Sequence, residues 1–194
     1  MLNVHPDKNQ KWLLMSTAIS GLLSTYIAAT LSKTIISELP AQWIAAQALV
    51  SAISGLIIGM IWKGRVRHAA ISKFSLLAIA ESTAGFGLGI YLLFQWNTWV
   101  FAIVALIYST LISNFVGKAI MAFRSVLWQE KEREIYDNNR QIVGSVICIV
   151  GFAFSIIALP PLKLAIALWA IGCIVDDIGW IIVYNINKKQ LSEI

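Results

Sequence analysis

Three carboxylates lie inside otherwise apolar stretches of this sequence: Glu81 and the adjacent pair Asp176 and Asp177. A charge within the hydrocarbon interior of a membrane is costly, so such residues are functional candidates by default. A carboxylate in that position takes up a proton, pairs with a cation or lines a wet cavity. A proton-coupled or cation-binding site needs these properties. The competing interpretation is structural, with pairing to a basic residue such as Lys73 or capping of a neighbouring helix end.

The apolar stretches around these acids belong to a series of six. They cover residues 12–32, 43–62, 74–94, 98–117, 142–159 and 164–184. Each has about 18–21 residues, enough to cross a hydrocarbon core of about 30 Å at about 1.5 Å per residue. The composition agrees, with 58% hydrophobic and 13% charged residues, against about a quarter charged in soluble domains. The sequence therefore predicts an all-α integral membrane protein, a six-transmembrane-helix bundle forming one domain over residues 1–194.

The three acids are expected at a similar depth in this bundle. Glu81 follows the start of its span near Lys73 by about eight residues, or about 12 Å. Asp177 precedes the end of its span near Tyr184 by about seven residues, or about 10 Å. Adjacent helix positions point about 100° apart, so Asp176 and Asp177 cannot share one ligand, and at least one should have a structural partner.

The basic residues predict the orientation of the chain. Of 15 Lys and Arg residues, all but Lys33 and Lys163 fall on the side of the N-terminus. Loops rich in Lys and Arg remain in the cytoplasm, so both termini should be cytoplasmic, in a bacterial inner membrane. The positive net charge of +5 thus reflects orientation in a lipid bilayer, and we expect no nucleic-acid partner.

Two connectors carry structural signals. Residues 95–97 are so few that the third and fourth spans should form an antiparallel hairpin. Residues 118–141 form the longest connector, and its first part has apolar residues at helical spacing. We expect span four to continue there as a helix at the membrane surface or beneath the bundle. Asp137, Asn138 and Asn139 are expected to stop that helix and to cap span five.

Uncharged polar residues suggest a cavity, and small residues suggest close helix contacts. The cavity candidates are Thr25, Tyr108 and Asn114. Asn114 is the most specific, because its amide needs partners in hydrocarbon. Small residues recur at four-residue spacing at Ser51, Gly55 and Gly59, and again at Gly85 and Gly89, which favours close approach of helix backbones.

The sequence carries no recognisable enzyme motif. It has no HExxH, no GxSxG and no phosphate-binding glycine loop, and neither His5 nor His68 lies within a span. Cys148 and Cys173 are isolated, without metal-binding spacing, and should be packing residues. We therefore expect a protein that is not an enzyme, with no cofactor and no metal.

The number of spans, the cytoplasmic termini and the lengths of the connectors resemble one half of a major facilitator superfamily transporter. Residues 59–68 are similar to that family's loop signature, G-x-x-x-D-R-x-G-R-R. Gly59 and Arg67 match it, whereas Lys63 occupies the acidic position; Arg65 lies in the same connector. Loss of the acidic residue removes one partner of the charge-pair latch that the signature provides in the family.

The resemblance implies that two six-helix bundles rock around a midplane site. A single bundle would then act as a homodimer or pair with another membrane protein. Spans one and four would line the cavity, and spans two and five would form the seam. The seam candidates are Ser51, Gly55, Gly59, Gly144 and Gly151.

The first functional hypothesis is a small secondary transporter that moves a small solute or ion, with proton coupling through Glu81 or Asp177. The alternative is a non-transporting interaction protein, such as a bacteriocin immunity protein or a subunit of a membrane complex. A channel is disfavoured, because no span carries repeated polar or charged rings on one face.

Overall fold

The computed structural model describes residues 7–107 and 112–191, and within them all regular structure is helical, without a strand. The order is α1 (Lys8–Glu38), α2 (Gln42–Ile61), α3 (Gly64–Ser72), α4 (Phe74–Phe94), α5 (Thr98–Ile107), α6 (Ser113–Leu127), α7 (Glu130–Ile157) and α8 (Leu162–Leu191). The predicted all-α class is therefore confirmed.

Among the described residues, four helices are long and apolar enough to cross a membrane: α1, α4, α7 and α8. Helix α2 supplies a fifth if it is taken together with α3, to which it is joined through a bend of 99°. The predicted number of six is not confirmed. The fourth predicted span, 98–117, is divided between α5 and α6, with residues 108–111 outside the described part. Helix α5 has only 10 residues, too few to cross a bilayer alone.

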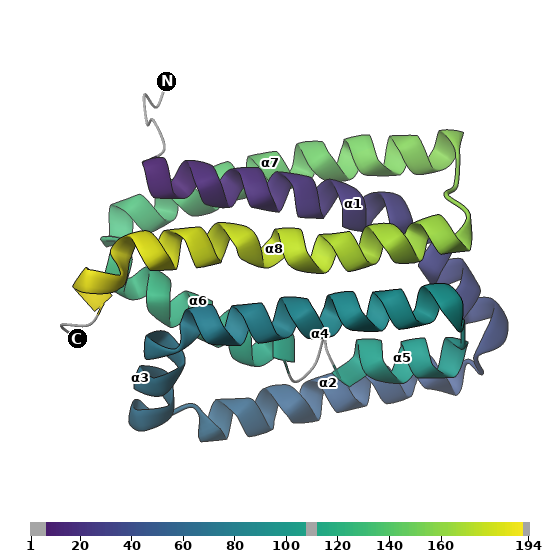
Figure 1. Cartoon of the computed structure of the whole chain (residues 1–194), viewed down its shortest axis with the longest axis horizontal. Helices are drawn as coiled ribbons and strands as arrows, with labels where there is room; N and C mark the ends of the chain where they lie inside the picture. The colour runs from purple at the N-terminus through teal and green to yellow at the C-terminus, as the bar shows by residue number, and fades with distance from the viewer. Residues whose placement is uncertain (1–6, 108–111, 192–194) are drawn as a thin grey trace.

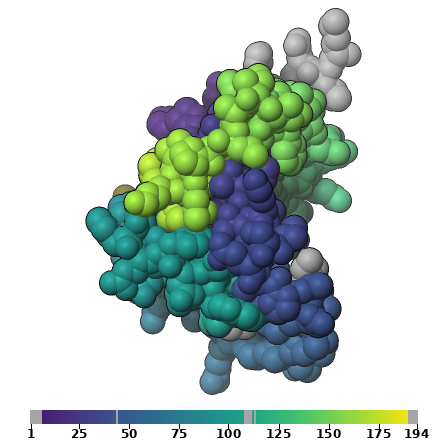
Figure 2. Space-filling view, turned by 90° about the vertical axis from the view of Figure 1, so that its right-hand side faces the viewer, coloured from purple at the N-terminus to yellow at the C-terminus, as the bar shows by residue number. Residues whose placement is uncertain are grey.

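The helices α7, α1, α8 and α4 pack side by side in that order (Figure 1). Helix α2 lies at the far edge from α7, as the view from one end also shows (Figure 2). The start of α1, the end of α8, helix α3 and the junction of α6 with α7 all gather at one end of the bundle, on the left in Figure 1. The connections α1–α2, α4–α5 and α7–α8 lie at the opposite end. Both ends of the described chain therefore lie at the same end of the bundle.

Two apolar clusters form the core, one toward each end of the bundle. The first is built around Phe74, Phe123 and Tyr184, whose rings pack with centroids 5.4–5.8 Å apart. The second includes Ile27, Leu31, Leu92, Phe101 and Ile166. Along α4 and α8, the acids Glu81, Asp176 and Asp177 fall between the residues that belong to the two clusters. The polar residues therefore occupy a layer between two apolar ones.

The start of α7 differs from the sequence prediction. The expected cap at residues 137–139 is wrong, because α7 begins at Glu130 and continues through these residues. Gln129 and Glu132 form a capping box, in which the Gln129 backbone N–H donates to the Glu132 carboxylate at 2.9 Å. This arrangement satisfies backbone donors that a helix start leaves free. The long connector contains a helix as predicted, since α6 extends to Leu127, and residues 95–97 connect α4 to α5. The position of α6 relative to a membrane and the antiparallel pairing of two full spans stay predictions.

Small residues set the spacing of the central helices. Gly89 of α4 faces Ala170 of α8, and a Cβ on Gly89 would lie 3.2 Å from the Ala170 Cα atom. Gly179 of α8 faces Ser16 of α1, where a Cβ would lie 2.8 Å from the Ser16 Cβ atom. Neither contact leaves room for a larger residue. Close backbone approach, predicted from the Gly85 and Gly89 spacing, is confirmed at Gly89.

Candidate functional site: a charged cavity between five helices

A cavity of about 520 Å³ lies between α1, α4, α6, α7 and α8. Six ionisable residues with opposite charges line it: Glu81, Asp176, Asp177, Lys118, Arg124 and Arg140. Further polar groups come from Thr17, Asn114, Tyr136 and Trp180. The acids belong to α4 and α8, whereas the basic residues belong to α6 and α7. The cavity thus takes its negative and positive charges from different pairs of helices.

The two adjacent aspartates have different partners. Asp177 is only 5% exposed, and it accepts a hydrogen bond of 2.6 Å from the Ser82 hydroxyl of α4. Asp176 is exposed and accepts a hydrogen bond of 3.1 Å from the Ser20 hydroxyl of α1. The expectation that at least one aspartate has a structural partner is therefore confirmed. Asp177 joins α8 to α4, and Asp176 joins α8 to α1.

Glu81 lies at the boundary between two kinds of surface. Its side chain is 7% exposed and lines the charged cavity. It also lines a neighbouring pocket of about 450 Å³, which is otherwise bounded by Ile58, Leu77, Ala80, Ile112, Phe115 and Val116. All the other lining residues of this second space are apolar. Glu81 is therefore the charged residue that the charged cavity and the apolar pocket share.

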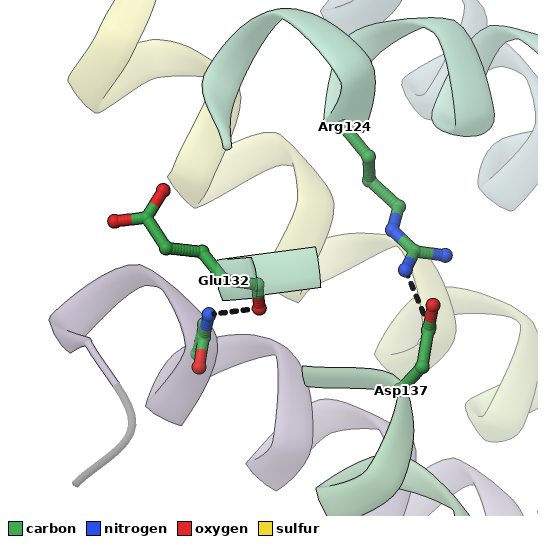
Figure 3. A network of polar contacts seen from close by, with 4 residues as sticks. Arg124, Glu132 and Asp137 are labelled. Carbon is green, nitrogen blue, oxygen red and sulfur yellow. Dashed lines mark hydrogen bonds and ion pairs between the residues drawn. The ribbon is translucent and has the colours of Figure 1, made fainter. Parts of the chain in front are cut away.

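Arg124 is fixed by contacts with α7. Its guanidinium forms an ion pair with Asp137, and Figure 3 shows the two side chains pointing toward each other from α6 and α7. The guanidinium carbon also lies 5.0 Å from the ring centroid of Tyr136, within cation–π range. Tyr136 is buried and packs on Trp128 at a centroid distance of 5.1 Å. These contacts hold the end of α6 against the start of α7, next to the cavity.

Helix α1 is also hydrogen bonded to the first turn of α7. The Gln10 side-chain amide donates a hydrogen bond of 3.0 Å to the backbone carbonyl of Glu132 (Figure 3). The side chains of Tyr136 and Thr17 are also hydrogen bonded. The basic side of the cavity is therefore tied to α1 as well as to α7.

We predict a modest energetic coupling between Arg124 and Asp137. In a double-mutant cycle of Arg124→Ala and Asp137→Ala, the coupling should be about 0.2–1 kcal/mol, because the Asp137 side chain is 55% exposed and solvent screens the pair. Arg124→Ala alone should cost more than Asp137→Ala alone, because it also removes the contact with Tyr136, worth about 0.5–2 kcal/mol. Denaturation of the purified variants in mild detergent measures both effects. Equal costs for the two single variants would contradict this account.

The three uncharged residues that were predicted to line a cavity have different outcomes. Asn114 of α6 lines the cavity. Thr25 of α1 does not; its hydroxyl donates a hydrogen bond of 2.8 Å to the Gly21 carbonyl of its own helix, and its side chain packs on Gly151 of α7. Tyr108 lies outside the described residues. One of the three candidates is thus placed at the charged cavity.

The residues of the loop resembling the transporter signature lie at the bend between α2 and α3. Gly59, in the last turn of α2, is exposed, and so are Arg65 and Arg67 on α3. The Arg67 guanidinium donates a hydrogen bond of 3.4 Å to the Ser125 hydroxyl of α6. Arg67 therefore contacts the α6 helix that borders the cavity, but none of the three residues lines the cavity.

The proposed seam residues divide into two groups. Gly151 is buried, and a Cβ there would lie 2.8 Å from the Thr25 Cβ atom of α1, so its small size serves a contact within the chain. Ser51 and Gly59 on α2 are exposed, and a Cβ on Gly55 or Gly144 would meet no described atom within 4 Å. These four positions are therefore open at the surface of the described chain.

The basic half of the site was missed from the sequence. Lys118, Arg124 and Arg140 lie in the long connector, where the sequence predicts no cavity role for them. A signal was present on α6, because Asn114, Gly117, Met121 and Arg124 recur at spacings of three and four residues and so share one helix face. All four line the cavity.

No protein-family model, curated protein or solved structure matches this chain. Within the described residues, no group of three or more His, Cys, Asp or Glu side chains is placed to hold a metal ion. The arrangement itself provides carboxylates that can exchange protons and basic groups that can bind an anion, inside a helical bundle.

Proposed function

We propose that this chain is a small secondary transporter, and that the charged cavity is its solute and proton site. One observation carries the proposal: ionisable residues of both signs, from four helices, line one cavity within an apolar bundle. Charges in such surroundings are costly to retain.

Proton coupling is proposed for Glu81 and Asp177, the two most buried acids of the cavity. The groups that face them there are Asp176 of α8, Lys118 and Arg124 of α6, and Tyr136 and Arg140 of α7. Charges of both signs thus line the cavity beside the two acids, and their balance affects proton binding there. A solute that approaches the basic groups would change this balance, and that change would couple its binding to proton uptake.

The basic side of the cavity, with Arg124 and Tyr136 near the junction of α6 and α7, lies toward the end of the bundle that carries both ends of the described chain. If the Lys and Arg distribution sets the orientation, this end faces the cytoplasm, and the cavity would represent a state accessible from inside. Exposure of the site to the other side requires a second wall that can move against this bundle. We therefore propose that the working unit is a homodimer, similar in plan to the two halves of a major facilitator transporter.

The proposal is tested with purified protein in liposomes that carry a pH gradient and an internal pH-sensitive dye. Small cationic, anionic, zwitterionic and neutral solutes are added separately. At least one class should cause proton movement that protein-free liposomes do not show. If no class moves protons or accumulates beyond the protein-free control, the transporter proposal fails.

The dimer is tested at Gly55. Because a Cβ there would meet no described atom within 4 Å, Gly55→Leu should leave the single chain folded but obstruct close contact with another helix. We expect a clear loss of crosslinked dimer in the membrane, with unchanged expression. Gly87→Leu is the matched control, because Gly87 of α4 is equally open but lies outside the proposed seam. An equal crosslinking yield for both variants would place the contact elsewhere.

A second candidate function is supported by α2. This helix packs mainly against α5 and α6, and its long apolar side chains Leu49, Leu56 and Met60 are each more than half exposed. A different membrane protein could cover this face, as expected for an immunity protein or a complex subunit. Absence of both transport and self-association, together with a stable heteromeric complex, would favour this function.

A further inference from the structure

We propose that the solute of this cavity is a zwitterion with an apolar substituent, of the size and type of an apolar amino acid. This inference rests on the proposed transport function and specifies its substrate class. The solute's positive group would face the acids of α4 and α8, and its negative group would face the basic residues of α6 and α7. Its apolar part would occupy the adjoining pocket beyond Glu81.

The charges of the cavity favour a solute of both signs. Three carboxylates and three basic groups line it, so their formal charges cancel, but the signs come from different helices. A solute with one charge would add net charge to the cavity, which is costly where charged groups are partly removed from water. A zwitterion adds no net charge and presents one charged group to the acids and another to the basic residues.

Arg124 retains capacity for an anionic group. Its ion pair with Asp137 involves one terminal guanidinium nitrogen. Its Nε atom is buried and has no hydrogen-bond partner among the described residues. A guanidinium can donate several hydrogen bonds in a fixed planar arrangement that suits a carboxylate. Arg140, one α7 turn beyond Tyr136, supplies a second positive charge to the same cavity.

The apolar pocket beside Glu81 supports the second part of the inference, the apolar substituent of the solute. It has a volume of about 450 Å³ and shares Glu81 and Val116 with the charged cavity. A polar site next to an apolar one selects solutes that carry both kinds of group. An ammonium group near Glu81 would therefore place a neighbouring hydrocarbon substituent at Leu77, Ala80 and Phe115.

Binding to the purified protein in detergent tests the inference with four probes. L-leucine carries both charges and an isobutyl group. Leucinamide lacks the carboxylate, 4-methylpentanoate lacks the ammonium group, and glycine lacks the apolar part. Leucine should bind at least about tenfold more tightly than each analogue, because each one leaves a charged or apolar part of the site unfilled. Equal binding of leucine and either singly charged analogue would overturn the inference.

Arg140→Gln provides an independent test, because Arg140 is exposed and its loss should not unfold the chain. It should weaken leucine binding at least about tenfold without changing leucinamide binding. Arg133→Gln is the control on the same helix, since Arg133 does not line the charged cavity. An equal effect of Arg140→Gln on leucine and leucinamide would contradict the assigned role.

Binding and transport results separate the two proposals. Leucine-selective binding without transport would retain the solute class and refute the transporter. Proton-coupled transport of a purely cationic or purely anionic solute would retain the transporter and refute the solute class.

Discussion

Replacement of Asp177 by asparagine should reduce solute accumulation driven by a pH gradient at least about tenfold, while the protein remains folded. Asparagine has nearly the same shape as aspartate, and its carbonyl oxygen can still accept the hydrogen bond from Ser82. The substitution removes the ability to gain and lose a proton, together with the negative charge of the ionised form. Glu81→Gln should have the same effect if the two buried acids work together. Reconstituted liposomes provide the measurement.

Controls distinguish a lost proton site from a general loss of charge. Glu134→Gln changes an exposed acid of α7 that does not line the charged cavity, and it should retain full accumulation. Exchange of solute without a pH gradient should be less affected than accumulation in Asp177→Asn, because exchange requires no net proton movement. Wild-type accumulation in both Asp177→Asn and Glu81→Gln would reduce these acids to structural partners and remove the main support for coupling.

The acidic half of the site was predictable because its signal is local. A carboxylate in an apolar segment is conspicuous, whatever the arrangement of the helices. Equal spacing from the span ends also predicted a similar depth for Glu81 and Asp177, and the structure brings both to one cavity. Their hydrogen-bond partners, Ser82 and Ser20, could not be assigned, because many serines were available and their choice depends on helix packing.

The basic half was not predictable in the same way. Lys118, Arg124 and Arg140 occur where charges are expected, in a connector outside the spans. Their role depends on α6 packing beside the bundle, which involves contacts with α3, α4 and α7. Local polarity gives no information on such long-range packing.

The wrong start of α7 has a simpler origin. Residues 137–139 are typical capping residues, but the helix starts earlier, at the Gln129–Glu132 pair. That pair has the three-residue spacing of a capping box, so the correct start was readable from the sequence. In the structure Asp137 serves a different purpose, as the partner of Arg124. A capping residue is therefore weak evidence when a long-range partner is available to it.

The α4–α8 interface holds both the acids and the closest helix contact. Ser82, Gly85 and Gly89 recur on the buried face of α4, and Ala170, Cys173 and Asp177 recur at matching spacing on α8. A Cβ on Gly89 would collide with the side chain of Ala170 and lie 3.7 Å from its backbone nitrogen. Because the obstacle is the first carbon of a side chain and its backbone, a change of rotamer cannot relieve it.

Gly89→Ala should therefore destabilise the protein by about 1–3 kcal/mol, the usual cost of overpacking a close contact. The matched variant Gly87→Ala is on the same helix, where a Cβ would meet no described atom within 4 Å. It should be neutral or stabilising by up to about 1 kcal/mol, because alanine favours a helix more than glycine does. Thermal denaturation in mild detergent compares the two. Since Asp177 and Ser82 belong to the same interface, Gly89→Ala should also weaken coupled transport in the protein that remains folded. Equal stability of the two variants would mean that α4 and α8 do not approach each other as closely as this interface requires.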